Sequence, residues 1–159
     1  DEGGAAITFP DMRWKRRDLK TVNLLGNVLA RQAASEAGAY EAILHEDGIV
    51  TEGAATNVFA VFDGVLCTHP LTQRILPGIT RKVVMELLGE LQLPVKEEPI
   101  AFARLAAAEE IFICGSTTDV TPVVTLDGKP VGNGKPGPLT VKVREAFEAR
   151  LYQAAGTAR

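Results

Sequence analysis

Two ionisable residues of this 159-residue chain stand where they could take part in catalysis. Lys20 precedes an amphipathic segment, and partial burial there would lower the pKa of its amine and make it a usable nucleophile. Glu52 ends a predicted strand and precedes a loop of small residues, Gly53–Thr56, which lets a ligand approach the backbone closely. Each could equally be a solvated surface residue, and spacing alone favours that interpretation for both.

Two glycine turns could bind an anion. Pro77–Thr80 leads directly into a predicted helix, and Gly115–Thr118 follows a predicted buried strand. Both turns expose backbone N–H groups, which make a helix N-terminus a ready phosphate site. Thr80 could also be a simple N-cap, so one shared anion site and two ordinary caps both remain open. Neither turn has the lysine of a P-loop in the required frame.

Other chemistries lack their motifs. His45 and His69 have no nucleophile in a Gly-x-Ser-x-Gly turn, and the chain has no Cys-x-x-Cys or His-x-x-x-His pair, so we expect no metal site. Its two cysteines, Cys67 and Cys114, are too few for a disulfide framework. We therefore expect packed thiols and a cytoplasmic protein.

Composition narrows the functional class further. The formal net charge is −3, which argues against a nucleic-acid partner, and no apolar run reaches the roughly 20 residues of a membrane helix. Hydrophobic residues at 46% and charged residues at 23% are ordinary globular values. The basic cluster Arg13–Arg17 is interpreted as a solvated loop or an intersubunit contact.

Hydrophobic periodicity predicts the elements that must position these residues. Four helices are predicted, over residues 22–37, 80–91, 103–109 and 139–151. Short strands are predicted over residues 7–9, 40–45, 48–52, 57–62, 65–68, 94–100, 111–114, 120–125 and 129–131. In the first helix the spacing of Val22, Leu25 and Leu29 predicts one buried stripe, which Gly38 terminates.

Three Asp-Gly pairs predict two-residue hairpin turns, and they are Asp47-Gly48, Asp63-Gly64 and Asp127-Gly128. Strands joined this way over residues 40–68 predict an antiparallel meander. A doubly wound parallel sheet would need a helix after nearly every strand, so the sequence favours an α+β fold with an antiparallel or mixed sheet and packed helices.

Four segments together resemble the class IV (fold type IV) aminotransferases, which are pyridoxal-phosphate enzymes. The segments, in chain order, are Asp11–Trp14 with Asp18–Leu25, Ile49–Gly53 with Asn57–Phe59, Pro77–Arg81, and Phe112–Thr117. Their order and spacing agree from about residue 11 to about residue 148. The lysine segment is most similar to that of the D-amino-acid (D-alanine) transaminase branch.

The resemblance implies a role for each matching residue. Lys20 would form a Schiff base with the cofactor and move a proton between the substrate α-carbon and the cofactor C4′. Glu52 would pair with the ring nitrogen, and Leu76 would pack against the ring face. The residues implied to hold the phosphate are Ile79, Thr80, Gly115 and Ser116. Ala54 and Ala55 depart from the family, where serines often follow the glutamate, and offer no hydroxyl to the cofactor.

The resemblance also implies an organisation. Residues 1–18 would be a linker and 19–155 the large, barrel-like cofactor domain, with the family's small N-terminal domain missing by truncation or cleavage. The implied activity is transamination between D-amino acids such as D-alanine and 2-oxo acids such as 2-oxoglutarate, in a homodimer. Three alternatives remain open: a branched-chain L-amino-acid aminotransferase, an aminodeoxychorismate lyase of the same fold, or an isolated domain that catalyses nothing.

Overall fold

A computed structural model describes residues 2–154 and 156 as one curled sheet with four helices. The strands are β1 (Gly4–Pro10), β2 (Glu41–Glu46), β3 (Ile49–Gly53), β4 (Asn57–Phe62), β5 (Val65–Thr68), β6 (Val95–Glu97), β7 (Ile100–Ala101), β8 (Glu110–Gly115), β9 (Asp119–Leu126) and β10 (Lys129–Pro130). The helices are α1 (Leu25–Glu36), α2 (Ile79–Glu90), α3 (Phe102–Leu105) and α4 (Pro138–Ala154). None of the described helices is long and apolar enough to span a membrane.

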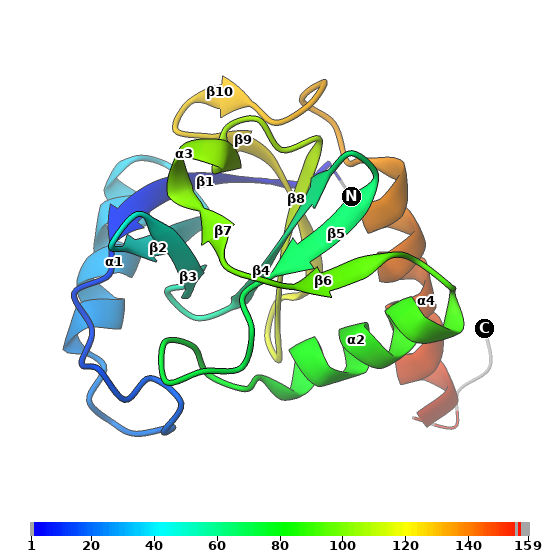
Figure 1. Ribbon diagram of the computed structural model, residues 1–159, viewed down its shortest axis with the longest axis horizontal. Helices are drawn as coiled ribbons and strands as arrows, with labels where there is room; N and C mark the ends of the chain where they lie inside the picture. The colour runs from blue at the N-terminus through cyan, green and yellow to red at the C-terminus, as the bar shows by residue number, and fades with distance from the viewer. Residues whose placement is uncertain (1, 155, 157–159) are drawn as a thin grey trace.

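The strand order shows why the sheet curls. It runs β6-β5-β4-β8-β9-β1-β2-β3-β7, so β6 and β7 lie at opposite ends of the path although they are consecutive in sequence. Only Glu98 and Pro99 separate them, and such a connection spans roughly 10 Å at most. The two edges must therefore approach each other, as Figure 1 shows. This confirms the α+β, barrel-like expectation, while the single strand predicted over 94–100 is in fact two strands.

The predicted antiparallel meander is wrong. β2 pairs with β3 and β4 pairs with β5, but β3 pairs onward with β7 and β4 with β8. The chain thus makes two separate hairpins whose outer partners come from distant segments. The sheet is mixed, because β1 runs parallel to both β2 and β9.

The opening residues take part in the sheet. Gly4–Pro10 forms β1, which lies between β9 and β2 near the middle of the strand order. The description of residues 1–18 as a linker therefore does not fit this segment, because its backbone hydrogen bonds join two parts of the domain. Residues 11–24 then run as a loop to the start of α1.

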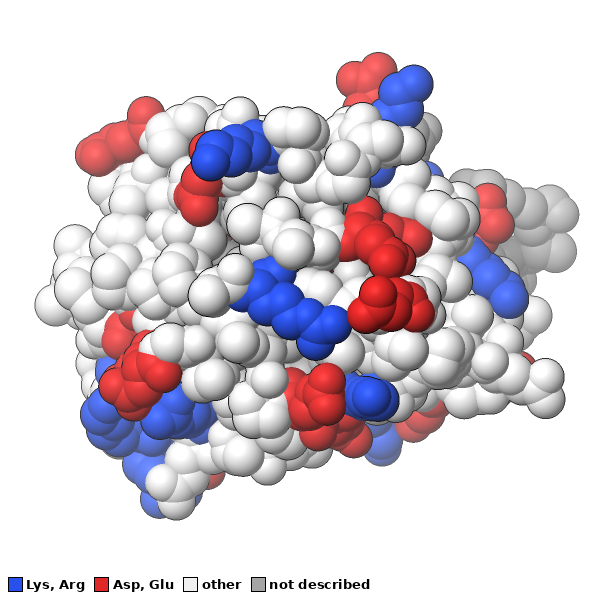
Figure 2. Space-filling view, turned by 45° about the horizontal axis from the view of Figure 1, so that its top comes forward, with Lys and Arg blue, Asp and Glu red and all other residues white. Residues whose placement is uncertain are grey.

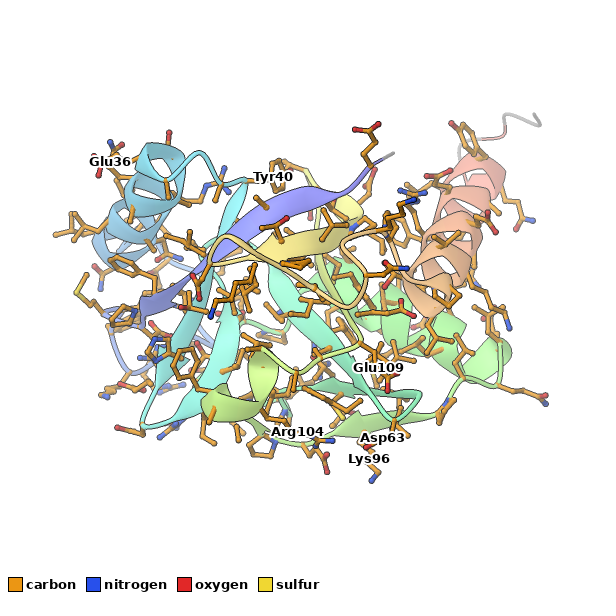
Figure 3. The ribbon with its side chains drawn as sticks, turned by 90° about the horizontal axis from the view of Figure 1, so that it is seen from above. Glu36, Tyr40, Asp63, Lys96, Arg104 and Glu109 are labelled. Atoms are coloured by element: carbon orange, nitrogen blue, oxygen red, sulfur yellow. The ribbon has the colours of Figure 1, made fainter. Side chains whose placement is uncertain are left out.

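All three predicted hairpin turns are confirmed. The Asp and Gly of each pair have positive φ, for example 51° at Asp63 and 72° at Gly64, as a type I′ turn requires. At this turn the Glu109 carboxylate accepts hydrogen bonds from both backbone N–H groups, at 2.9 and 3.2 Å. Arg104 lies 3.5 Å from the Asp63 carboxylate, and Figure 3 shows these side chains gathered around the hairpin tip.

Hydrophobic side chains fill both faces of the curled sheet. One cluster lies inside the curl and includes Ile43, Val58 and Ile111. A second cluster, with Phe59 and Phe112 stacked at 4.7 Å, is covered by α2 and α4, which lie together on the outer face (Figure 1). Figure 2 shows charged side chains of both signs side by side over the surface, separated by wide uncharged areas.

Helix α1 buries a different face from the predicted one. It begins at Leu25 rather than at residue 22, and it packs Ala30 and Ala34 against the sheet. Val22 is 97% exposed and Leu25 is 68% exposed, so the expected buried stripe points away from the described domain. We call this surface the exposed apolar face, and it comprises Met12, Trp14, Leu19, Val22, Leu24, Leu25, Val28 and Leu29.

Candidate functional site

Glu52 lies at the centre of a buried hydrogen-bond cluster. It stands on β3 and is 3% exposed. Its Oε1 accepts from Nη1 of Arg13 at 2.5 Å, and its Oε2 accepts from Nδ2 of Asn57 at 3.0 Å. The backbone N–H of Leu76 lies within 3.1 Å of both oxygens. Glu52 is therefore an oriented buried carboxylate rather than a surface one.

The environment of Glu52 pulls its pKa in two directions. Burial is the largest effect and raises the pKa, because a carboxylate loses its hydration there, and the net pKa of Glu52 is about 7. The charge and hydrogen bond of Arg13, and then the N–H of Leu76, act in the opposite direction. The protonation state of Glu52 is thus set by its partners near neutral pH.

Both oxygens of the Glu52 carboxylate accept hydrogen bonds from the described residues. Two carboxylate oxygens offer about four lone-pair positions. The described residues supply three donors, from Arg13, Asn57 and Leu76, the last of them shared between both oxygens. Because the single Leu76 N–H contacts both oxygens, a further donor such as the protonated ring nitrogen of a pyridinium cofactor could replace one of its two contacts.

Asn57 connects Glu52 with both glycine turns. Its Nδ2 also donates to the Leu76 carbonyl at 3.0 Å, and a Cβ added at Gly78 would lie 2.2 Å from its Oδ1. On the sheet, Asn57 pairs with Cys114, the residue before Gly115. Both candidate anion turns therefore adjoin the first residue of β4.

The turn before α2 leaves its backbone donors uncapped. Gly78 is the N-cap, so the interpretation of Thr80 as a capping residue is wrong, and no side chain caps the helix. The first N–H groups of a helix have no intrahelical acceptor, and they attract anions. Ile79 is 78% exposed and Thr80 is buried. The second turn is more open, with Gly115 half-buried and Ser116 exposed. These groups fit a phosphate.

Lys20 lies outside the hydrogen-bond cluster. It is exposed, and within the described part of the chain it makes no hydrogen bond or ion pair. Its segment is nevertheless tied close to the cluster, because the Arg17 N–H donates to the Gln73 carbonyl at 3.0 Å, three residues before Leu76. The structure brings Glu52 and Leu76 into contact but does not bring Lys20 to either, so its role stays a prediction.

A second buried carboxylate holds the small-residue loop in place. Glu41 is 1% exposed and accepts from Thr56 Oγ1 at 3.0 Å and from the Ala55 N–H at 3.3 Å. Nδ2 of Asn27 donates to the Ala54 carbonyl at 2.6 Å. The loop is thus fixed through its backbone and through Thr56, without hydroxyls at the two alanines.

Sequence reasoning missed the burial of the basic cluster. Arg13 and Arg17 are not solvated, since their side chains are 7% and 1% exposed. Arg13 pairs with Asp11 and Glu52, and Arg17 pairs with Asp11 and Glu46. The acidic residue two positions before Arg13 was the available signal. The roles of Asn57 and Glu41 gave no comparable signal, because their partners meet only in the fold.

The cysteines are packed as predicted. Cys67 and Cys114 are free and buried, and no disulfide joins them. Burial raises the pKa of Cys114 to about 12, so its thiol is no nucleophile at neutral pH.

Comparison with known proteins identifies the family. Residues 5–126 match the model of the amino-transferase class IV family. D-alanine aminotransferase from Bacillus licheniformis is 47% identical over 146 residues, which cover 92% of this chain and 52% of that protein. D-alanine aminotransferase from Staphylococcus aureus (strain COL) is 44% identical over 148 residues, with 93% and 52% covered. The chain therefore spans about half the length of the relatives it matches.

A solved structure agrees with this match. The branched-chain amino acid aminotransferase from Thermobaculum terrenum, in its PLP-form, superposes with a TM-score of 0.88 at 29% identity, covering 96% of this chain and 52% of that one. Sequence motifs, fold and the match over residues 5–126 all agree, and the chain belongs to the class IV aminotransferase family.

Proposed function

We propose that the protein containing this chain transfers amino groups between D-amino acids, such as D-alanine, and 2-oxo acids, such as 2-oxoglutarate. The observation that carries the proposal is the buried and oriented Glu52 carboxylate beside two turns that suit a phosphate. The substrate class follows the relatives named D-alanine aminotransferase, which are 44% and 47% identical to this chain. Because the chain covers about half of their length, substrate choice also depends on residues outside it.

The proposed cofactor is pyridoxal 5'-phosphate. When bound, it supplies an aldehyde that condenses with amines and a protonated pyridine ring that accepts electrons. Glu52 accepts the ring N–H and keeps the nitrogen protonated. The N–H groups at Ile79 and Thr80, with those of Gly115 and Ser116, hold the phosphate, and the Leu76 side chain covers one ring face.

Lys20 is proposed as the residue that carries the cofactor and moves the proton. An exposed amine on a loop can reach a ligand from solvent and turn with it, which a packed lysine cannot do. For proton transfer it must be held close to the substrate α-carbon. The rest of the protein is expected to close over this loop and supply that restraint.

We further propose a homodimer in the cytoplasm. The exposed apolar face around α1 groups many uncovered hydrophobic side chains. Such a surface is typical of a protein–protein contact rather than of a surface that faces only water. It adjoins the loop that carries Lys20, so a second copy seated on it would also shield the reaction site from water.

Covalent labelling tests the site assignment. The protein as encoded by its gene is incubated with pyridoxal phosphate, reduced with borohydride and digested for mass spectrometry. We expect the cofactor mass on Lys20, its loss in Lys20→Ala, and full labelling in the control Lys129→Ala, whose lysine lies on β10. Full labelling of Lys20→Ala would contradict the assignment.

Turnover tests the reaction. With 2-oxoglutarate as acceptor, D-alanine should be converted to pyruvate faster than L-leucine is converted to its oxo acid. The reverse preference would support the branched-chain L-amino-acid alternative, and turnover of aminodeoxychorismate would support the lyase. The 159-residue chain assayed alone shows whether this half catalyses anything by itself.

A further inference from the structure

Arg13 is the one cation, among the described residues, within ion-pair distance of Glu52. Its Nη1 lies 2.5 Å from Oε1, and the two side chains are 7% and 5% exposed. A charged pair so poorly hydrated is strongly coupled, because little water screens it. Removing one partner would leave the other charge buried and uncompensated.

Asp11 fixes Arg13 from the opposite side. Nε and Nη2 of Arg13 donate to the two Asp11 oxygens at 2.9 and 2.7 Å, which is the bidentate geometry that holds a guanidinium in one plane. Asp11 also accepts from Thr51 Oγ1 at 2.7 Å, and Thr51 precedes Glu52 on β3. The same strand therefore orients both ends of this ion-pair chain.

Gly26 provides the space that Arg13 occupies. A Cβ at this position of α1 would lie 3.0 Å from Cγ of Arg13 and 3.1 Å from its Cα and N. Any side chain there would press on the arginine, so the close approach of α1 depends on glycine. Helix α1 therefore confines the backbone and Cγ of Arg13, while Asp11 and Glu52 bind its guanidinium.

We propose that Arg13, held by Asp11, is a positioning residue that favours the carboxylate form of Glu52 and directs it at the cofactor ring nitrogen. The role at the ring rests on the proposed function, whereas the coupling between Arg13 and Glu52 exists without any cofactor.

The mechanism concerns the position of one proton shared by Glu52 and the cofactor ring. Between Glu52 and a ring nitrogen, the proton lies either on the nitrogen, facing a carboxylate, or on the carboxyl group, facing an unprotonated ring. Only the first arrangement makes the ring an electron acceptor. The positive charge of Arg13 favours the carboxylate and therefore places the proton on the nitrogen.

The other charged groups nearby either favour protonation of Glu52 or are paired with other residues. Asp11 is the second charge acting on Glu52, and it favours protonation. Arg17 is engaged by Asp11 and Glu46, and Lys15 also pairs with Glu46. With Arg13 in place the pKa of Glu52 is about 7, so loss of this one cation would raise the pKa further and leave Glu52 protonated at neutral pH.

The first test measures Glu52 without cofactor. Cofactor-free protein with ¹³C-labelled glutamate is titrated by NMR, and the Glu52 carboxyl signal is assigned by its loss in Glu52→Gln. In Arg13→Met the midpoint should rise by about one pH unit or more, a tenfold gain in proton affinity. The matched control Arg16→Met removes an arginine of the same loop that is 46% exposed and pairs with Asp18, and it should leave the midpoint unchanged. An unmoved midpoint in Arg13→Met overturns the inference.

Two further variants keep the test decisive. Arg13→Gln, which keeps a polar side chain, replaces Arg13→Met if that variant does not fold, with the same expected rise. Arg13→Lys restores the charge without the two-pronged contact to Asp11, and its midpoint should return toward that of the unmodified protein. If the titration midpoint of Glu52 in Arg13→Lys were as high as in Arg13→Met, the charge of Arg13 would have no role.

The second test measures whether the ring nitrogen of the bound cofactor is protonated. Pyridoxal phosphate labelled with ¹⁵N in the ring should give a protonated-nitrogen chemical shift in the unmodified protein and in Arg16→Met, and move toward the unprotonated value in Arg13→Met or Arg13→Gln. An unchanged shift in those variants overturns the role at the ring. If the unmodified protein does not bind the cofactor at Lys20, the proposed function is refuted instead. The titration of cofactor-free protein would still test the coupling between Arg13 and Glu52.

Discussion

Nδ2 of Asn57 lies 3.0 Å from Oε2 of Glu52, and the same amide nitrogen lies 3.0 Å from the carbonyl oxygen of Leu76. One buried side chain thus joins the candidate ring-nitrogen acceptor to the segment that leads into α2. Strand β3 and the turn at residues 77–80 are separate in sequence, and Asn57 fixes the distance between them.

Replacement of Asn57 should therefore damage stability and cofactor binding together. Asn57→Leu keeps a similar volume but removes one donor from Glu52 and one from the Leu76 carbonyl, which should lower the free energy of unfolding by about 1–3 kcal/mol. Urea denaturation measures the loss, and fluorescence titration with pyridoxal phosphate should show weaker binding. Asn133→Ala removes only a local hydrogen bond from the Lys135 N–H at an exposed turn, so it should leave cofactor binding unchanged and cost less stability. Equal stability of the two variants would contradict the linking role.

Glu52 should make the cofactor-free protein less stable as pH rises from about 4.5 to about 7. Its pKa is raised from 4.5 to about 7 on folding, so in this interval the folded state binds more protons than the unfolded state. Stability falls with pH wherever that is so, here by about 3 kcal/mol at most. Unfolding free energies across this range should show the fall, and Glu52→Gln should flatten it. A slope identical in both proteins would show that Glu52 does not titrate as described.

Glu46 should give the opposite dependence at lower pH. Hydrogen bonds from Arg17 and Lys15, together with their charges, lower its pKa from 4.5 to about 2. Its stabilising contribution is complete above about pH 4.5 and is lost as pH falls toward 2. Glu46→Gln should remove part of the acid destabilisation, on the order of 1 kcal/mol. Unchanged acid unfolding in this variant would count against the pairing, and Glu145→Gln serves as the control at a residue outside the ion-pair cluster.

Local signals in the sequence predicted local structure well. The three Asp-Gly turns and the helix at residues 79–90 depend on residues that are neighbours in the chain, and each is confirmed. Strand pairing was less predictable. The outer partners of β3 and β4 are β7 and β8, and nothing within residues 49–62 specifies such distant partners.

The candidate site shows the same division. The Glu52 motif and the two glycine turns could be named from their residue types, but the burial of Arg13 could not. Glu52 lies 39 positions after Arg13, and the two side chains meet only when β1 and β3 join one sheet. For α1, periodicity revealed an apolar stripe correctly, but it could not reveal that the described domain leaves this stripe uncovered.

Two helical glycines should respond differently to alanine. At Gly89 in α2 an added Cβ meets nothing within 4 Å, so Gly89→Ala should raise the free energy of unfolding by about 0.5–1 kcal/mol. At Gly26 the Cβ would lie 3.0 Å from Cγ of Arg13, so Gly26→Ala should lose that gain and raise the Glu52 titration midpoint. Thermal unfolding and the NMR titration measure both effects. Equal stabilisation by the two alanines would mean that Arg13 is not confined by α1.

The exposed apolar face should respond to charge. Val28 is 58% exposed on α1, so Val28→Glu should leave the fold of the chain intact, as circular dichroism would show. A carboxylate buried without a partner is costly at an interface, so the variant should sediment as a monomer at micromolar concentrations where the unmodified protein is a dimer. Leu151→Glu is the matched control, because Leu151 is 45% exposed on α4, far from α1 in Figure 1, and should leave the mass unchanged. If Val28→Glu also remains a dimer, the second copy does not sit on α1, and the exposed apolar face must be covered by another part of the protein.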